Sequence, residues 1–341
     1  MTTKRATSPL LMLLFLLLFP SLQARSRWSP DILGPRFQAT TVRQRPDYYG
    51  PEVSTVIRRL ADCTSRGLGV LYIHGFNDYF FQKEMADSFA AHAIDFYAVD
   101  LRGYGRSTLP GRRQFDIRNI SEYYSDIDSA LSIMQTAGID SVILMGHSTG
   151  GLIAASFMAR HPSPMVCSMI LNSPFLDWNL GKTERWIWAV DLIGAIIPRM
   201  KIPQGMSDAY SAALLASEHG EWNFNTAWKH PVSPDVTAGW VRAIDLAQRW
   251  LHHHPYTVKV PVLLMYSAQS YFGDNWTPEA SRADAVLDVN EIRRYGMRLS
   301  LDVHAVKVVG GLHDLVLSAP GVRAGVYKSM FRWIGVPPCT H

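Results

Sequence analysis

The residues that offer the clearest chemistry surround one serine. Residues 146–150 read Gly-His-Ser-Thr-Gly, so Ser148 has a glycine two positions away on each side. Small residues at these positions allow a tight turn between a strand and a helix, and such a turn exposes the serine hydroxyl. An apolar run precedes the motif and a helical pattern follows it. The motif therefore predicts a serine nucleophile for acyl transfer.

A serine nucleophile needs a general base within hydrogen-bond reach, and in this chain order the base follows the last strand. His313 stands in Gly-Gly-Leu-His-Asp at residues 310–314, directly after an apolar run. We therefore predict that His313 takes the Ser148 proton. The histidines at 252–254 fit a solvated surface better, and no His or Cys spacing in the sequence indicates a metal site.

Two backbone N–H groups are expected to stabilise the negative charge that develops on the substrate oxygen. The N–H of Thr149 lies at the start of the predicted helix, where the helix dipole is positive. The N–H of Phe76 is the second candidate, because Gly75 follows an apolar run and lets the backbone approach the substrate carbonyl. His74 fits a structural histidine that holds this loop.

The elements that must position these residues follow from an alternation of apolar runs with amphipathic segments. Runs rich in Val, Ile, Leu and Tyr predict buried parallel strands at residues 69–73, 96–99, 142–145, 168–171, 262–266 and 305–309. Amphipathic patterns predict helices at residues 82–92, 120–137, 152–161 and 321–334. This order predicts a mostly parallel sheet flanked by helices, with ligands bound beyond the carboxyl ends of the strands.

Between about residues 175 and 258 helical patterns rich in aromatic residues replace the strands. Seven of the ten tryptophans lie in this stretch, namely Trp178, Trp186, Trp188, Trp222, Trp228, Trp240 and Trp250. An inserted helical cap would explain both features, because a cap must pack on the sheet and also line a pocket. We expect most of these rings to form the core of the cap.

The N-terminal segment differs from the rest of the chain. Lys4 and Arg5 precede the unbroken apolar run 10–19, and Ala24 follows it. This order predicts a secretory signal peptide over residues 1–24, because the run has about half of the roughly 20 residues that a membrane-spanning helix needs. An uncleaved membrane anchor is the alternative. We expect a secreted or periplasmic protein.

Composition and charge exclude several classes of protein. With 48% hydrophobic and 18% charged residues, the chain can bury a sizeable core, which excludes disordered and fibrous proteins. The formal net charge of +4 is mild and no basic cluster interleaves with aromatics, so we expect no nucleic acid partner. Cys63, Cys167 and Cys339 are too few for a disulfide framework, and a Cys63–Cys339 bridge stays open, as does the oligomeric state.

Four motifs together resemble the α/β-hydrolase superfamily, and within it the monoacylglycerol lipase and lysophospholipase-like hydrolases, also described as serine aminopeptidase S33-like. They are His-Gly at 74–75, Asp-Leu-Arg-Gly-Tyr-Gly-Arg-Ser at 100–107, Gly-His-Ser-Thr-Gly-Gly at 146–151 and Gly-Leu-His-Asp at 311–314. The resemblance extends from about residue 68 to residue 334. It implies an α/β-hydrolase domain over residues 25–341 with a cap insertion at about 175–258. It also implies hydrolysis of acyl esters through an acyl-enzyme, without a cofactor or metal ion.

The acid that should orient His313 departs from the family pattern. Similar proteins place an aspartate just after the strand that corresponds to residues 262–266, but Ser-Ala-Gln-Ser at 267–270 has no carboxylate. The sequence Ala-Asp-Ala-Val-Leu-Asp at 283–288 resembles the acid loop of the family, so we predict Asp284, with residues 271–282 as an insertion. Asp288 and then Asp274 are the alternatives. The structural alternative makes Asp284 a carboxylate at a helix N-terminus.

Together these residues predict a serine hydrolase, either a carboxylesterase or a lipase-like enzyme, that acts on a small-molecule acyl ester. The aromatic and apolar cap favours lipid-like substrates such as monoacylglycerols or lysophospholipids, and it would allow transient contact with a lipid surface. An S33-type peptidase is the alternative within the resemblance. A non-catalytic ligand-binding protein of the same fold is the alternative from another class, and it is disfavoured because the serine and the histidine stand where catalysis needs them.

Overall fold

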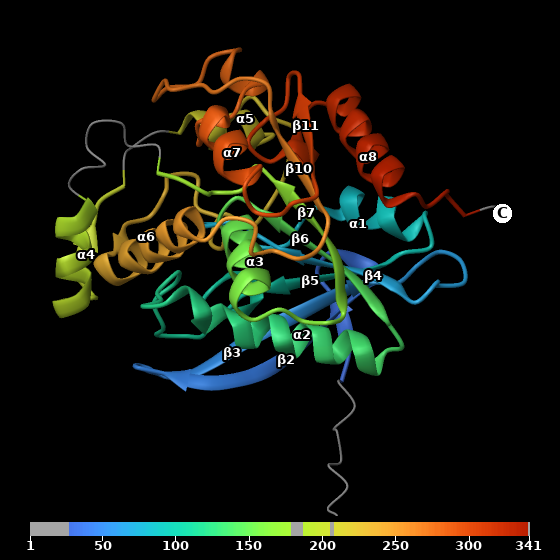
Figure 1. Ribbon diagram of the computed structural model, residues 1–341, viewed down its shortest axis with the longest axis horizontal. Helices are drawn as coiled ribbons and strands as arrows, with labels where there is room; N and C mark the ends of the chain where they lie inside the picture. The colour runs from blue at the N-terminus through green and yellow to red at the C-terminus, as the bar shows by residue number, and fades with distance from the viewer. Residues whose placement is uncertain (1–26, 179–186, 205–207, 340–341) are drawn as a thin grey trace, which may run out of the picture.

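A nine-stranded sheet runs through the centre of the computed structural model, which describes residues 27–178, 187–204 and 208–339. The strand order is β1-β2-β3-β5-β4-β6-β7-β10-β11, and helices flank the sheet (Figure 1). The predicted leader at residues 1–24 lies outside the described residues, and so does Trp186. No helix in the described ranges is both long and apolar enough to cross a membrane.

Six parallel strands form the larger part of the sheet. They are β4 (Leu68–Ile73), β5 (Asp95–Asp100), β6 (Ser141–His147), β7 (Val166–Asn172), β10 (Val262–Ser267) and β11 (Val303–Val308). Every neighbouring pair among them is parallel. The predicted strands match these bounds to within two residues, and the prediction of a mostly parallel sheet is confirmed.

Three antiparallel strands that the sequence patterns do not predict form one edge of the sheet. They are β1 (Ser29–Asp31), β2 (Gly34–Asp47) and β3 (Gly50–Arg59), and β3 pairs antiparallel with β5. Much of β2 is exposed or half-buried, so polar residues are frequent along it. These strands therefore lack the continuous apolar runs by which buried parallel strands are found.

Helices cover both faces of the sheet. The helices outside the β7–β10 connection are α1 (Lys83–Ala90), α2 (Tyr124–Thr136), α3 (Thr149–Arg160), α7 (Val289–Gly296) and α8 (Pro320–Ile334). Short 3-10 helices lie at Gly105–Ser107, Ile120–Tyr123, Ala280–Arg282 and Leu315–Leu317.

The two faces of the sheet make separate cores because side chains alternate along each strand. In β4, Leu71 and Ile73 join the core that α2 and α3 cover, whereas Val70 and Tyr72 join the core that α1 and α8 cover. Each of these side chains is fully buried, and full burial of such a side chain contributes about 1.5–3 kcal/mol. The rigid sheet therefore fixes the loops that leave its carboxyl edge.

Helices occupy the connection between β7 and β10, where the cap insertion is expected. The elements are α4 (Ile187–Ile196), β8 (Lys201–Ile202), α5 (Ala209–Leu214), β9 (Val236–Thr237) and α6 (Ala238–His253). Thr237 caps α6, because its Oγ1 accepts the N–H of Trp240 at 3.0 Å. Trp240 and Ile244 are buried in the same core as α2 and α3, so α6 anchors this connection to the main domain.

A disulfide joins the loop after β3 to the segment after α8. Cys63 follows β3 and Cys339 follows α8, and their Cα atoms lie 6.2 Å apart. The backbone N–H of Cys339 also donates a hydrogen bond of 2.7 Å to the carbonyl of Ala91. The pairing that the sequence leaves open is therefore present, and Cys167 is an exposed free cysteine. Because it restricts the unfolded chain, such a bridge typically contributes about 2–4 kcal/mol.

Candidate active site

Ser148 occupies a sharp turn between β6 and α3. Its backbone has φ 53° and ψ −121°, a conformation that costs a residue with a side chain about 1–3 kcal/mol. A Cβ atom on Gly146 would lie 2.5 Å from the carbonyl oxygen of Gly150, and one on Gly150 would lie 2.3 Å from that of Ile73. Glycine is therefore required on both sides of Ser148, which explains the spacing in the motif.

His313 lies in the loop after β11 and contacts a buried carboxylate. Its Nδ1 is 2.9 Å from Oδ2 of Asp284, and both side chains are buried. The other oxygen, Oδ1, accepts the N–H groups of Val286 at 2.9 Å and Leu287 at 2.8 Å. Because a carboxylate can only accept, the proton of the neutral His313 ring lies on Nδ1. Its Nε2 is then available as a base.

The structure separates Asp284 from the two alternative acids. Asp288 is the N-cap of α7, where its Oδ1 accepts the N–H of Asn290 at 2.8 Å. Asp274 is exposed on the preceding loop. The helix-terminal role considered for Asp284 thus belongs to Asp288, and of the three aspartates only Asp284 is bonded to His313.

Backbone pairing explains how a long loop returns Asp284 to the end of β10. The N–H of Asp284 donates to the carbonyl of Gln269 at 2.8 Å, and the carbonyl of Asp284 accepts the N–H of Tyr271 at 2.7 Å. These two bonds close the loop at its base. Asp284 therefore lies beside the end of β10, although residues 268–283 separate the two in the chain.

Phe76 and Thr149, the two expected oxyanion donors, line the same cavity as Ser148 and His313. In the described part of the chain no acceptor takes the backbone N–H of either residue. The Phe76 ring packs 4.8 Å from the ring of Trp240, which holds its loop in place. His74 has the expected structural contacts, because its Nδ1 lies 2.8 Å from the carbonyl of Gly75 and its Nε2 accepts the N–H of Leu101 at 3.1 Å.

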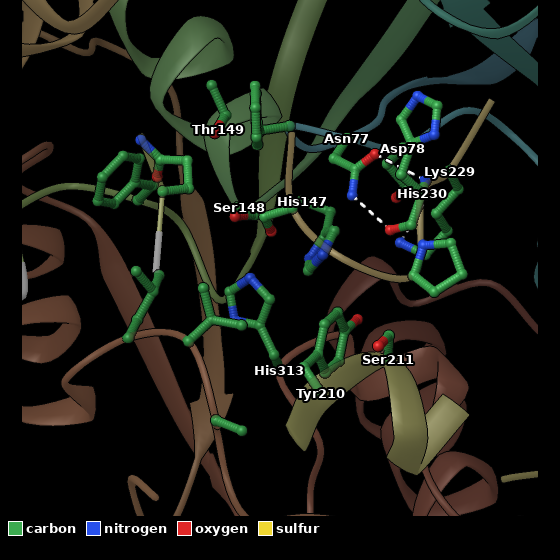
Figure 2. A pocket seen from close by; sticks show the side chains of 18 of the residues that line it. Asn77, Asp78, His147, Ser148, Thr149, Tyr210, Ser211, Lys229, His230 and His313 are labelled. Carbon is green, nitrogen blue, oxygen red and sulfur yellow. Dashed lines mark hydrogen bonds and ion pairs between the residues drawn. The ribbon is translucent and has the colours of Figure 1, made fainter. Parts of the chain in front are cut away.

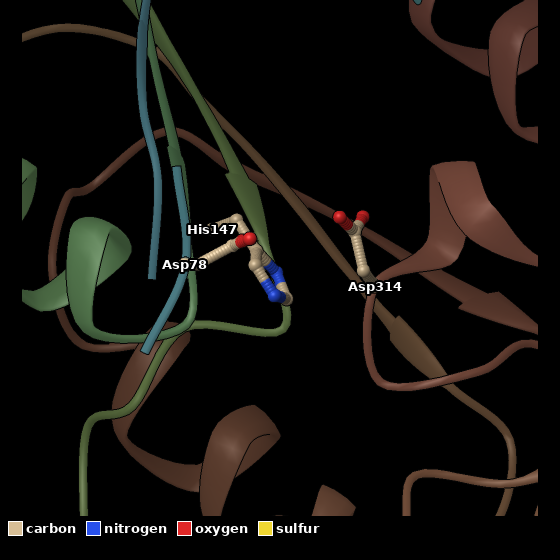
Figure 3. A group of neighbouring side chains, drawn as sticks. All are labelled: Asp78, His147 and Asp314. Atoms are coloured by element: carbon tan, nitrogen blue, oxygen red, sulfur yellow. The ribbon is translucent and has the colours of Figure 1, made fainter. Parts of the chain in front are cut away.

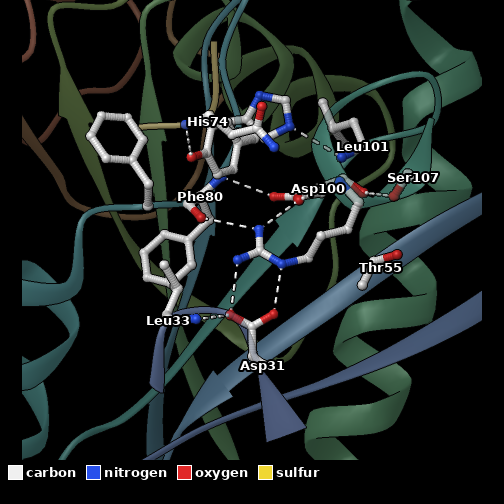
Figure 4. Close-up of polar contacts among 12 residues, drawn as sticks. Asp31, Leu33, Thr55, His74, Phe80, Asp100, Leu101 and Ser107 are labelled. Atoms are coloured by element: carbon white, nitrogen blue, oxygen red, sulfur yellow. Dashed lines mark hydrogen bonds and ion pairs between the residues drawn. The ribbon is translucent and has the colours of Figure 1, made fainter. Parts of the chain in front are cut away.

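A buried ion-pair network holds the segment that follows β4 in place. Arg106 contacts Asp100 at 2.8 Å and Asp31 at 2.7 Å, and Asp100 also accepts the N–H of Phe80 at 2.9 Å (Figure 4). Burial opposes the charge of Arg106, but the two carboxylates outweigh it and raise its pKa. The Asp-Leu-Arg-Gly-Tyr-Gly-Arg-Ser motif at 100–107 therefore ties β5 to β1 and to the segment after Phe76, through Asp100 and Arg106. Its contacts are structural.

The cavity in front of Ser148 has a volume of about 360 Å³, and both apolar and polar residues line it. Figure 2 shows Asn77, Asp78, Lys229 and His230 to one side of Ser148. The apolar part of the lining consists mainly of Phe76, Phe175, Trp178, Phe224, Trp240, Val286 and Leu287. A bound molecule would therefore meet both aromatic and polar side chains in the cavity beside the serine.

A second buried polar group consists of Asp78, His147 and Asp314 (Figure 3). Lys229 lies 3.1 Å from Asp78, while Asp314 accepts hydrogen bonds from Asn172 at 2.6 Å and from Gln82 at 3.0 Å. Burial lowers the pKa of His147, which favours its neutral form. These carboxylates already have protein donors, so the group is a hydrogen-bonded network in this structure.

Sequence reasoning missed the Asp78–Lys229 pair of this network. The two residues are 151 positions apart, and neither lies in a motif that marks it. Only the packing of the cap segment onto the loop after β4 brings them together. Asn77 reinforces that contact, because it exchanges two hydrogen bonds of 2.8 Å with the backbone of His230.

Comparison with solved structures shows that the chain has the α/β-hydrolase fold. It superimposes on a monoglyceride lipase from Saccharomyces cerevisiae with a TM-score of 0.65, over 87% of this chain and 96% of that one, at 17% sequence identity. A carboxyl esterase from Bacillus coagulans gives a TM-score of 0.64, over 87% and 98% of the two chains, at 14% identity. At these identities the likeness concerns the fold.

The family follows from sequence comparison. Residues 66–284 match the family described as serine aminopeptidase, S33, and the chain belongs to that family. The resemblance seen in the sequence motifs is thereby confirmed.

Two curated relatives carry lipid-related names. Phospholipase YtpA of Bacillus subtilis is 27% identical over 139 residues, which cover 40% of this chain and 52% of that protein. A monoacylglycerol lipase of Mycolicibacterium smegmatis is 29% identical over 155 residues, which cover 44% of this chain and 52% of that protein. The chain thus matches about half the length of these relatives.

Proposed function

We propose that this protein is a serine hydrolase that cleaves carboxylic esters with a lipid-like acyl group. One observation carries the proposal: Ser148 on its strained turn shares a cavity with His313, whose Nδ1 is 2.9 Å from the buried carboxylate of Asp284. This arrangement supplies a nucleophile, a base and an orienting acid. Relatives named phospholipase and monoacylglycerol lipase support the same reading.

The proposed mechanism has two halves. In the first, Nε2 of His313 takes the hydroxyl proton while Ser148 Oγ attacks the ester carbonyl, and the N–H groups of Phe76 and Thr149 stabilise the oxyanion. The alcohol then leaves with the proton from His313. In the second half, His313 activates a water molecule that attacks the acyl-enzyme, which releases the acid and restores Ser148. Asp284 keeps the ring of His313 oriented and stabilises its charged form.

The lining of the cavity favours an ester over a peptide with a free amino terminus. Recognition of an ammonium group requires a carboxylate whose charge is available. Among the described residues that line the cavity, only Asp78 is acidic. Its Oδ1 already pairs with the Lys229 Nζ at 3.1 Å, which neutralises its charge. The aromatic wall, in contrast, suits the methylene groups of an acyl chain.

Kinetics with an ester series tests the proposed function. For p-nitrophenyl esters we expect kcat/KM to rise from acetate toward medium chain lengths, because each buried methylene contributes about 0.8 kcal/mol, or roughly fourfold. Monoacylglycerols and lysophospholipids should also be cleaved. The Ser148→Ala protein gives the background rate. Faster release from aminoacyl p-nitroanilides than from any ester would assign the site to a peptidase, and absence of any hydrolysis would favour a ligand-binding role.

We further propose that residues 1–24 direct export and are removed. The short apolar run at 10–19 supports this proposal, and so does the Cys63–Cys339 disulfide, because structural disulfides persist mainly in oxidising compartments. Expression with the native N-terminus should give protein outside the cytoplasm that begins near Arg25, as N-terminal sequencing can establish. An intact Met1 in a membrane fraction would mean that the run serves as an anchor.

A further inference from the structure

The buried group of Asp78, His147 and Asp314 takes one residue from each segment that carries a proposed catalytic group. Asp78 follows the proposed oxyanion donor of the loop after β4 by two positions, His147 directly precedes the nucleophile, and Asp314 directly follows the proposed base. A carboxylate oxygen of each aspartate and a ring nitrogen of His147 all lie within 4.8 Å of one another. The group therefore joins the three catalytic segments below their reactive atoms.

Two acidic residues of this group share one cation, which comes from the connection between β7 and β10. The Nζ of Lys229 is 3.1 Å from Oδ1 of Asp78, and the two side chains are only 8% and 2% exposed. Burial lowers the pKa of His147, which favours its neutral form, so His147 adds no positive charge. The carboxylate of Asp314 is bonded to neutral amide donors. Among the residues that the structure describes, Lys229 alone forms an ion pair with the group.

Three aromatic rings surround the ammonium group of Lys229. Its Nζ lies 5.9, 5.6 and 5.7 Å from the ring centroids of Phe81, Tyr210 and Phe224. These distances allow cation–π attraction, which stabilises the ammonium where water is excluded. The ring of Tyr210 also packs edge-on against the ring of His313, with centroids 5.4 Å apart. The rings that hold Lys229 therefore extend to the proposed base.

The segment that carries Lys229 is bonded to the loop after β4. Asn77 exchanges two hydrogen bonds of 2.8 Å with the backbone of His230 (Figure 2), and the Tyr79 hydroxyl accepts the N–H of Asn225 at 2.8 Å. Asn77 has φ 48°, in the left-handed region that asparagine tolerates better than most residues. These bonds hold an unusual backbone conformation directly beside the proposed oxyanion donor. The docked segment also places its lysine in the buried group.

We propose that Lys229 is a positioning residue, whose charge holds the oxyanion loop, the serine turn and the loop of His313 in their catalytic arrangement. Without it, the Asp78 carboxylate would stay buried near Asp314 with no countercharge, which is strongly unfavourable. The loop after β4 would then have to move so that the carboxylate reaches water. This role rests on the proposed function, because catalysis is what the arrangement serves.

Direct binding of substrate by Lys229 is the competing role, since Lys229 also lines the cavity. An anionic group of a substrate would have to displace the Asp78 carboxylate from the ammonium. That exchange would leave Asp78 buried without a partner, at the same cost as removal of the lysine. The ion pair therefore favours the positioning role.

A double substitution separates the two roles. With p-nitrophenyl acetate, whose acyl group is too short to need a distant contact, Lys229→Met should lower kcat about tenfold or more, because it leaves Asp78 unpaired. The addition of Asp78→Asn removes the unpaired charge, so kcat should return to within about threefold of the wild-type value. If Lys229 binds the substrate instead, the double variant will be no faster than Lys229→Met, and the loss will appear in KM.

Hydrogen exchange gives a second readout, which does not require activity. The backbone N–H groups of residues 76–80 should exchange about tenfold faster or more in Lys229→Met, and near the wild-type rate in the double variant. Arg59→Met is the matched control, because Arg59 is equally buried and pairs with Asp62 and Asp87, which do not line the cavity. It should lower the melting temperature but leave kcat and the exchange of residues 76–80 unchanged.

Equal exchange in the wild-type protein and Lys229→Met, or a double variant that restores neither readout, would overturn the proposal. If Lys229→Met does not fold, Asp78→Asn replaces it in the comparison, because it leaves the lysine unpaired and should likewise be improved by the second substitution. A wild-type protein that hydrolyses no ester but shows the expected exchange pattern would remove the proposed function and keep the positioning role of Lys229.

Discussion

Replacement of Ser148 by alanine should reduce kcat for ester hydrolysis by about 10⁴-fold or more, because it removes the proposed nucleophile that forms the acyl-enzyme. The fold should be unaffected. Alanine must adopt the same backbone conformation, φ 53°, so the strain of the turn stays in place. We expect the melting temperature to change by no more than a degree or two, as measured by calorimetry beside the kinetics.

Ser173 offers a matched control for this substitution. It is also a buried serine with a positive φ, 46°, and its hydroxyl has no hydrogen-bond partner in the described structure. Ser173→Ala should therefore leave both kcat and the melting temperature near the wild-type values. Retention of more than about a tenth of the rate in Ser148→Ala would remove Ser148 from its proposed role.

Asp284→Asn should lower kcat by up to about 10⁴-fold while the shape of the site is kept. The reason lies in the hydrogen bonds of the carboxylate. Its Oδ1 accepts two backbone N–H groups, those of Val286 and Leu287, so an asparagine would place its carbonyl oxygen there and its amide group toward His313. The amide would then donate to Nδ1, which forces the ring proton onto Nε2. In that tautomer His313 cannot accept the proton of Ser148.

The other two aspartates serve as controls for Asp284→Asn. Asp288→Asn should alter kcat by less than about twofold, because asparagine caps a helix about as well as aspartate. Asp274→Asn changes an exposed loop residue and should have no effect on rate. If Asp284→Asn lowers the melting temperature but keeps the rate within tenfold of wild type, Asp284 is a structural residue. If Asp288→Asn slows the reaction instead, Asp288 and not Asp284 is the acid that orients His313.

The parts of the fold and site that could be predicted each depend on a pattern in contiguous residues of the sequence. A buried parallel strand needs a continuous apolar run, and the turn at Ser148 needs glycine at fixed offsets, so both requirements appear in contiguous residues. The strands of the parallel sheet and the position of His313 follow from such signals. β1, β2 and β3 do not, because a partly exposed antiparallel strand tolerates polar residues at many positions.

Other features depend on contacts between distant segments. The family resemblance suggested Asp284, but only the backbone bonds to Gln269 and Tyr271 show how the inserted loop brings it to His313. Nothing near Asp78 in the sequence points to Lys229 as its partner.

Helix α4 shows a conflict between pattern and packing. Its apolar composition suggests a buried helix, and we expect most tryptophans of this region to form the core of the cap. Trp240 is buried, in the core that α2 and α3 share, but Trp188 is 59% exposed, because the contact of α4 with α6 uses Gly194 and Asp191 instead.

Covalent labelling with a fluorophosphonate probe tests the central claim most directly, because the probe reacts with an activated serine and requires no knowledge of the substrate. After tryptic digestion, mass spectrometry should find a single phosphonylated residue, Ser148, in the wild-type protein. Ser173→Ala should label equally, Ser148→Ala should not label, and Asp284→Asn should label far more slowly. An unlabelled wild-type protein, under conditions in which a known serine hydrolase is fully modified, or an adduct on a different residue, would contradict the account.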